Sequence, residues 1–121
     1  MEDRPAVHTR TAPPIVRLAA EIDVTNSGSA YADLAAECLP GVGTVIADMT
    51  QTSFCDSSGV RALVRVHKLA ADDGAELSLV ITSGAVLRIL ELSGLTGILR
   101  IYPSIDAAVA AWRDRGGAKR S

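Results

Sequence analysis

The sequence contains few aromatic residues: Phe54, Trp112 and two tyrosines are the whole set among 121 residues. Because 48% of the chain is nevertheless hydrophobic, we expect one buried core built mainly from Val, Leu, Ile and Ala. The length and the even composition suit a single domain spanning residues 1–121. We place its core at about residues 15–114, with flexible tails at 1–5 and 115–121.

The sequence also lacks an excess of charge of one sign and lacks long hydrophobic runs. A net charge of -2 gives no basic surface of the kind that direct nucleic-acid binding requires. The polar start "MEDRPAVHTR" is not followed by the apolar run of a signal peptide, and no stretch is long enough to span a membrane. We therefore expect a soluble, cytoplasmic protein that binds no nucleic acid directly and does not insert into membranes.

Cysteine and histidine are scarce, which narrows the possible chemistry. Cys38 and Cys55 are too few for a disulfide framework, and with the two histidines they show no metal-ligand spacing. We favour two reduced thiols facing the core, and a redox pair is the alternative. The chain also has no phosphate-binding GxxxxGK[ST] motif, so we expect no metal and no cofactor.

Apolar segments of strand length alternate with segments of helical periodicity. Strands are predicted at 15–20, 43–49, 77–81 and 98–101, a short edge strand at 6–11, and helices around 31–38, at 57–73, within 82–94 and from 104 onward. Parallel neighbours need a crossover between them, which these helices supply. The pattern predicts an α/β domain with a mixed, mostly parallel sheet of four to five strands and about four helices, packed mainly on one face.

The segment "FCDSSGV" (54–60) places two hydroxyls and a carboxylate between a buried strand and a helix. A serine hydrolase of this type carries its nucleophile in a Gly-x-Ser-x-Gly turn, and the first glycine of that motif is replaced here by Cys55. His67 lies more than two helical turns from Ser57 and is too far away to act as its general base. A small serine hydrolase is therefore a weak alternative. Asp56, Ser57 or Ser58 can instead cap the helix. The cluster also lies beyond the carboxyl end of a strand, where parallel-sheet proteins place their sites.

Three segments carry a resemblance to a known family. "FCDSSGVRALVRVHKLA" resembles the signature of the STAS domain, in particular that of bacterial anti-sigma factor antagonists. "IVRLAAEIDVT" resembles the second strand and following turn of that family, and "TSGAVLRILELSGLTGILRIYPSIDAAVAA" resembles its carboxyl-terminal part. The similarity covers about residues 15–112, in the same order and spacing. It implies an α/β fold with a mixed sheet and helices largely on one side.

The resemblance also implies a function and a mechanism. Members of this family bind an anti-sigma factor that is also a protein kinase, and the kinase phosphorylates the serine after the aspartate, which is Ser57 here. The phosphorylated antagonist no longer binds, and a phosphatase resets it. The expected protein is thus a regulator and not an enzyme. The alternative within the family is a STAS subunit of a stress-signalling complex or of a cytoplasmic lipid-transport assembly.

Five residues around Ser57 are expected to form the partner-binding site: Asp23, Asp56, Ser58, Gly59 and Arg61. Asp23 either orients the Ser57 hydroxyl or caps the first long helix. Ser58 is expected to be a helix cap and not a second phosphorylation site. Gly59 is expected to let the backbone of the partner come close. Arg61 either belongs to a solvated basic face or pairs with an acidic group of the partner or with the phosphate.

Overall fold

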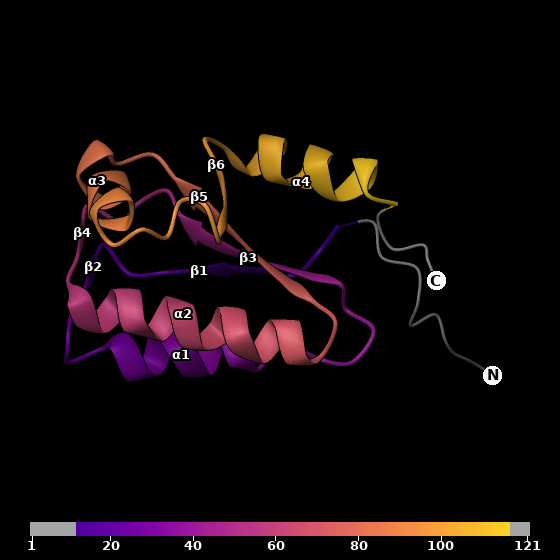
Figure 1. The fold of residues 1–121 in the computed structure, drawn as a ribbon, viewed down its shortest axis with the longest axis horizontal. Coiled ribbons are helices and arrows are strands. Elements are labelled where there is room, and N and C mark those ends of the chain that lie inside the picture. Colours follow the sequence, from indigo (N-terminus) through magenta and orange to yellow (C-terminus); the bar gives the residue numbers. More distant parts are fainter. Residues whose placement is uncertain (1–11, 117–121) are drawn as a thin grey trace.

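The computed structural model describes residues 12–116 (Figure 1). The predicted edge strand at 6–11, the amino-terminal tail and most of the carboxyl-terminal tail lie outside these residues. The elements follow one another as β1 (Ile15–Arg17), β2 (Glu21–Ile22), α1 (Ser27–Ala35), β3 (Thr44–Met49), β4 (Phe54–Cys55), α2 (Ser57–Asp72), β5 (Glu76–Ile81), α3 (Gly84–Leu92), β6 (Arg100–Tyr102) and α4 (Ile105–Asp114).

The strands form two parallel arrangements. The main sheet has the order β1-β3-β5-β6, and every strand pair within residues 12–116 is parallel. A second, two-stranded sheet pairs β2 with β4. The expected α/β fold with a four-stranded sheet is thereby confirmed. Strands β2 and β4 lie outside the strands predicted from the sequence, because two residues are too few to show a periodic pattern.

The helices cover the main sheet unequally. The larger core packs α1, α2 and α3 against one face through residues such as Leu34, Leu63 and Leu90. On the other face, α4 places Ala108 against Ile46 and Val80. Figure 1 shows α1 and α2 together on one side of the strands and α4 on the opposite side. The expected packing of helices mainly on one face is therefore confirmed.

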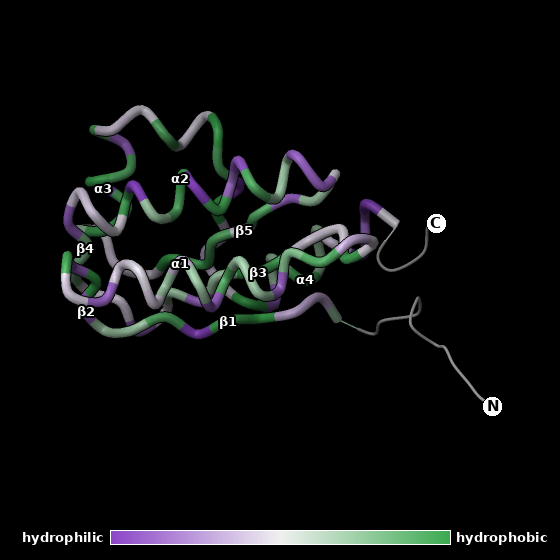
Figure 2. The backbone as a smooth tube through the Cα atoms, turned by 90° about the horizontal axis from the view of Figure 1, so that it is seen from below, coloured by the Kyte–Doolittle hydropathy of each residue, from purple (hydrophilic) through white to green (hydrophobic). Residues whose placement is uncertain are grey.

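Helix α2 is the element that positions the candidate site. Its buried residues recur at helical spacing and are Gly59, Ala62, Leu63, Val66 and Ala70. In Figure 2 hydrophobic and hydrophilic residues follow one another within each turn of the helix, as expected for a helix with one face on the core. It ends where Gly74 adopts a left-handed backbone with φ of 72°, close to the predicted end. Burying a side chain such as Leu63 contributes roughly 1.5–3 kcal/mol.

None of the helices within residues 12–116 has the length and apolar character needed to cross a membrane.

Candidate functional site

The candidate site lies where β4 passes into α2. Pairing of β2 with β4 sets Ile22 beside Cys55, and the backbone amide of Asp56 donates to the carbonyl of Ile22 at 3.0 Å. This pairing brings the turn that contains Asp23 to the start of α2. Figure 1 shows β2, β4, α3 and the first turns of α1 and α2 gathered at one end of the molecule. Ser57, at the start of α2, lies at that end.

Asp56 is the residue that caps α2. Its carboxylate accepts hydrogen bonds from the backbone amides of Ser58 at 2.8 Å and Gly59 at 3.3 Å, and from the Ser58 hydroxyl. Its extended backbone, with φ of -91° and ψ of -172°, is the usual conformation of a residue just before a helix. The structure therefore selects Asp56 from the three possible caps. The expectation that Ser58 is a cap is wrong, because its hydroxyl donates to the cap.

Ser57 is left free by this arrangement. It is the first residue of α2, its side chain is exposed, and its hydroxyl forms no hydrogen bond with any residue in the described part of the chain. A group added to this oxygen would extend into solvent beside the amino terminus of a helix, where negative charge is favoured. The hydroxyl can therefore be modified without breaking a hydrogen bond within residues 12–116.

The neighbouring carboxylate carries a negative charge at neutral pH. The hydrogen bond from the Ser58 hydroxyl is the largest cause that lowers the pKa of Asp56, and backbone amides of Gly59 and Ser58 and the positive charge of Arg61 act in the same direction. The Ser57 hydroxyl thus lies next to a fixed anion. A phosphate on Ser57 would add further negative charge at this point.

Asp23 occupies the same end of the molecule but performs neither of its two expected roles. Its carboxylate accepts hydrogen bonds from the amide and the hydroxyl of Thr25, and its backbone carbonyl accepts from the amides of Asn26 and Ser27. The residue before α1 is Asn26, so Asp23 does not cap that helix. Its carboxylate is not hydrogen-bonded to Ser57 either. Asp23 shapes the turn between β2 and α1.

Gly59 has an internal packing role. It is buried, and a Cβ atom at this position would lie 2.5 Å from the Sγ of Cys55 and 2.8 Å from a methyl carbon of Ile22. Glycine is required here because α2 starts directly against β2 and β4. The expectation that Gly59 lets the backbone of a partner come close is therefore wrong, since the domain itself fills that space.

Both cysteines face the core, as predicted. Cys38 and Cys55 are free and buried. Burial, with a smaller contribution from the charge of Asp56, raises the pKa of the Cys55 thiol to about 11. Burial is also the largest cause that raises the pKa of Cys38. These thiols stay protonated at neutral pH, which makes them unreactive.

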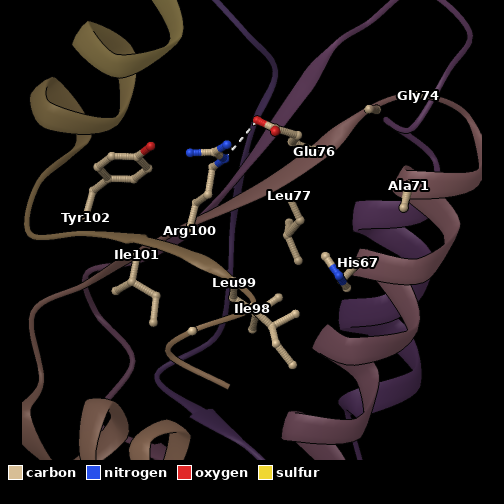
Figure 3. A pocket seen from close by; sticks show the side chains of 12 residues that line it. His67, Ala71, Gly74, Glu76, Leu77, Ile98, Leu99, Arg100, Ile101 and Tyr102 are labelled. Atoms are coloured by element: carbon tan, nitrogen blue, oxygen red, sulfur yellow. Dashed lines mark ion pairs between the residues drawn. The ribbon is translucent and has the colours of Figure 1, made fainter. Parts of the chain in front are cut away.

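A sizeable cavity lies away from Ser57. It measures about 760 Å³ and is formed by the second half of α2, the start of β5, and β6 with the loop before it (Figure 3). His67 lines this cavity, and an ion pair of 3.0 Å joins Glu76 to Arg100 beside it. His67 is ten positions beyond Ser57, a distance of roughly 15 Å along a helix. His67 therefore cannot act as a base for Ser57, which argues against the serine hydrolase.

Residues 12–116 contain no group of three or more His, Cys, Asp or Glu side chains that could hold a metal ion.

Comparison with known proteins identifies the family. The profile of the STAS domain matches residues 4–108. The chain belongs to the STAS domain family. This STAS domain is 32% identical over 98 residues to the putative anti-anti-sigma factor Rv2638 of Mycobacterium tuberculosis, a match covering 78% of this chain and 66% of that protein. It is 28% identical over 92 residues to the putative anti-sigma factor antagonist BtrV of Bordetella bronchiseptica, covering 76% of this chain and 79% of that protein. Neither name denotes an enzyme.

Solved structures share the fold of this STAS domain. An anti-sigma factor antagonist from Mycobacterium paratuberculosis superposes with a TM-score of 0.77 at 22% identity, covering 88% of this chain and 90% of that one. The anti-sigma factor antagonist SpoIIAA in its unphosphorylated form gives a TM-score of 0.69 at 24% identity, covering 89% of this chain and 93% of that one.

Sequence reasoning missed part of the surface around Ser57 of this STAS domain. Val24, Phe54 and Leu92 are large hydrophobic residues with exposed fractions of 76%, 47% and 74%. They come from the β2–α1 turn, β4 and the end of α3, which gather at the end of the molecule where α2 begins (Figure 1). A single exposed residue in a loop carries no periodic signal, so only the fold reveals that the three share one end.

Proposed function

We propose that this STAS domain is an anti-sigma factor antagonist, which binds a kinase-type anti-sigma factor and is released when that kinase phosphorylates Ser57. The observation that carries the proposal is the free, exposed hydroxyl of Ser57 beside a cap supplied entirely by Asp56. The names of the two relatives support the choice of partner. The domain acts by binding, without enzymatic activity of its own, in the cytoplasm, and a phosphatase resets it.

Phosphorylation would change the surface and not the fold. A phosphate adds nearly two negative charges and three acceptor oxygens. The amino terminus of α2 tolerates that charge, and no hydrogen bond within the described residues is lost. A partner that packs closely over Ser57 would meet both bulk and repulsion, the latter increased by the ionised Asp56. Affinity for the partner falls while the domain stays folded.

The surroundings of Ser57 suit a protein partner. Exposed apolar side chains at the same end, Val24, Phe54 and Leu92, supply the hydrophobic area that a stable interface needs. Charged and polar groups, among them Asp56, Ser58 and Arg61, surround Ser57 and give specificity. Asp23 takes part by fixing the turn that carries Val24.

The test combines a phosphorylation assay with a binding assay. The protein is incubated with ATP and each kinase-type anti-sigma factor of its host, and the added phosphate is located by mass spectrometry. We expect phosphate on Ser57 and none in Ser57→Ala, while Ser58→Ala remains a substrate. Ser57→Ala should bind the partner in the presence of ATP, and Ser57→Asp should not bind. The proposal fails if no host kinase modifies Ser57, or if Ser57→Asp binds as tightly as the parent.

A further inference from the structure

A small cleft opens between the first turns of α1 and α2. It measures about 140 Å³ and is lined by Ser27, Gly28, Ser58, Arg61, Ala62 and Arg65. The two guanidinium groups and the Ser27 hydroxyl are the hydrogen-bond donors available here, since the Ser58 hydroxyl already donates to Asp56, and Gly28 and Ala62 leave room between the helices. No acidic side chain belongs to this lining. The composition is that of a site for a small anion.

The two arginines differ in how they are held. The guanidinium of Arg65 stacks on the ring of Tyr31, 4.0 Å from its centroid, which restricts its position. Arg61 has no stacking partner of this kind in the described part of the chain. Within residues 12–116, neither arginine forms an ion pair with a carboxylate. The charge of Arg61 acts on Asp56 without forming an ion pair, so within the described residues both guanidinium groups keep donors that an anion from outside can use.

We propose that this cleft binds a carboxylate from an acidic segment of the partner protein. Arginine binds carboxylates through two parallel N–H donors, and such charge-assisted bonds are the strongest polar contacts available at a surface. The volume of about 140 Å³ suits the end of one Asp or Glu side chain. That the acidic segment belongs to an anti-sigma factor rests on the proposed function; the affinity of the cleft for a carboxylate does not.

The position of the cleft connects it with Ser57. Arg61 lies four residues beyond Ser57, which is one helical turn along the same face of α2. A partner that inserts a carboxylate between Arg61 and Arg65 therefore covers the Ser57 hydroxyl. A phosphate on Ser57 would lie beside the same guanidinium groups and would repel the incoming carboxylate. The cleft explains why a modification at one hydroxyl can displace a whole partner.

The first experiment needs no partner. The full chain, labelled with ¹⁵N, is titrated with a hexaglutamate peptide and followed by NMR, and a hexalysine peptide is the control. We expect shifts at the amides of Ser27 and Gly28 and at the side-chain Nε of both arginines. The double variant Arg61→Gln/Arg65→Gln should bind about tenfold more weakly, as expected for lost bonds to a charged group.

Arg113 provides the matched control, because it is equally exposed but lies on α4, across the sheet. Arg113→Gln should bind the hexaglutamate peptide like the parent. The inference is overturned if Arg113→Gln weakens binding as much as the double variant does, or if the shifts are spread evenly over all exposed arginines.

The second experiment separates the inference from the proposed function. It measures binding to the kinase-type anti-sigma factor. Arg61→Glu should bind this partner about tenfold or more weakly than the parent, and the difference should become smaller at high salt. Ser57→Ala should bind as the parent does. If Arg61→Glu binds normally while Ser57→Ala behaves as proposed, the cleft inference is wrong and the proposed function stands. If the peptide occupies the cleft but no kinase modifies Ser57, the proposed function is wrong and the cleft stands.

Discussion

The carboxylate of Asp56 accepts the backbone amide of Ser58 at 2.8 Å, and this bond closes the first turn of α2 without the hydroxyl of Ser57. Two neighbouring residues therefore have separate roles. Asp56 stabilises the helix, and Ser57 presents an oxygen that forms no hydrogen bond with the described residues. Because the two roles are separate, Ser57 can be modified without weakening the cap that Asp56 provides. Measurements of the stability of variants at the two positions test this separation.

Replacing the cap should destabilise the domain, whereas replacing the phosphorylation site should not. Asp56→Ala leaves amides of the first turn without an acceptor, and we expect its thermal midpoint to fall by roughly 4 °C. Ser57→Ala removes a hydroxyl that has no partner among the described residues, so its midpoint should stay within about 1 °C of the parent. Thermal unfolding followed by circular dichroism compares the two. A larger loss in Ser57→Ala would show that Ser57, and not Asp56, supports the helix.

The stability should also depend on pH through the same carboxylate. The pKa of Asp56 is lowered in the folded state, chiefly by the Ser58 hydroxyl. Its stabilising effect is therefore complete above the unfolded pKa of about 4 and is lost as the pH falls through the lower, folded pKa. In urea titrations at successive pH values, Asp56→Asn should show a weaker loss of stability below about pH 4 than the parent. Parallel curves for the two proteins would contradict this assignment.

The sequence predicts the main elements well because their signals are long. A sixteen-residue helix with one buried face can be located from its periodicity, and strands β3 and β5 from their apolar runs between glycines and polar residues. Strands β2 and β4 have two residues each, and their pairing is a tertiary fact that no local pattern encodes. The turn that Asp23 shapes becomes defined only when β2 is paired, so neither role expected for Asp23 from the sequence describes it.

The requirement for glycine at position 59 should be steric and should depend on Cys55. In Gly59→Ala the new methyl group would lie 2.5 Å from the Cys55 Sγ, and overpacking of this kind costs about 1–3 kcal/mol. Removing the sulfur in Cys55→Ala/Gly59→Ala should recover part of that loss, giving a coupling of about 0.5–3 kcal/mol in a double-mutant cycle. Urea titrations of the parent, the two single variants and the double variant give the four free energies of unfolding that the cycle needs.

Gly84 supplies the control for this substitution. A Cβ there would meet no atom within 4 Å, so Gly84→Ala should be neutral or slightly stabilising. If Gly59→Ala is as stable as the parent, the packing of α2 against Ile22 and Cys55 is looser than described.

The residue types around Ser57 predict part of the candidate site but do not assign a role to each side chain. The spacing of Asp56, Ser57 and Ser58 indicates a helix start and a candidate phosphorylation site, but three side chains in sequence can each serve as the cap. Only the backbone geometry assigns that role to Asp56. The cleft shared with Ser27 depends on α1 packing beside α2, a contact between segments thirty residues apart.

Neither cysteine should react in the native protein. With a pKa of about 11, the Cys55 thiolate is about a thousandfold rarer than the thiol at about pH 8. Iodoacetamide should therefore leave both Cys38 and Cys55 unmodified in the folded domain, as measured by intact mass, and should modify both in concentrated guanidinium. Rapid single labelling of the native protein would show that one thiol is exposed and would reopen the possibility of redox regulation.

A buried hydroxyl without a partner marks a position where the domain can be stabilised. The side chain of Ser78 in β5 is completely buried, and its oxygen forms no hydrogen bond with any described residue. Leaving such a group unsatisfied costs about 1–3 kcal/mol, so Ser78→Ala should raise the free energy of unfolding by about 1 kcal/mol.

Thr52 provides the contrasting case for Ser78, because its equally buried hydroxyl donates to the carbonyl of Ala19 at 2.8 Å. Thr52→Val keeps the shape and removes that bond, and should lower the free energy of unfolding by about 1 kcal/mol. Urea titrations of the two variants should therefore move in opposite directions from the parent. If Ser78→Ala is destabilised as much as Thr52→Val, the Ser78 hydroxyl has a partner, and the sheet beneath α4 is hydrated or more open than the structure indicates.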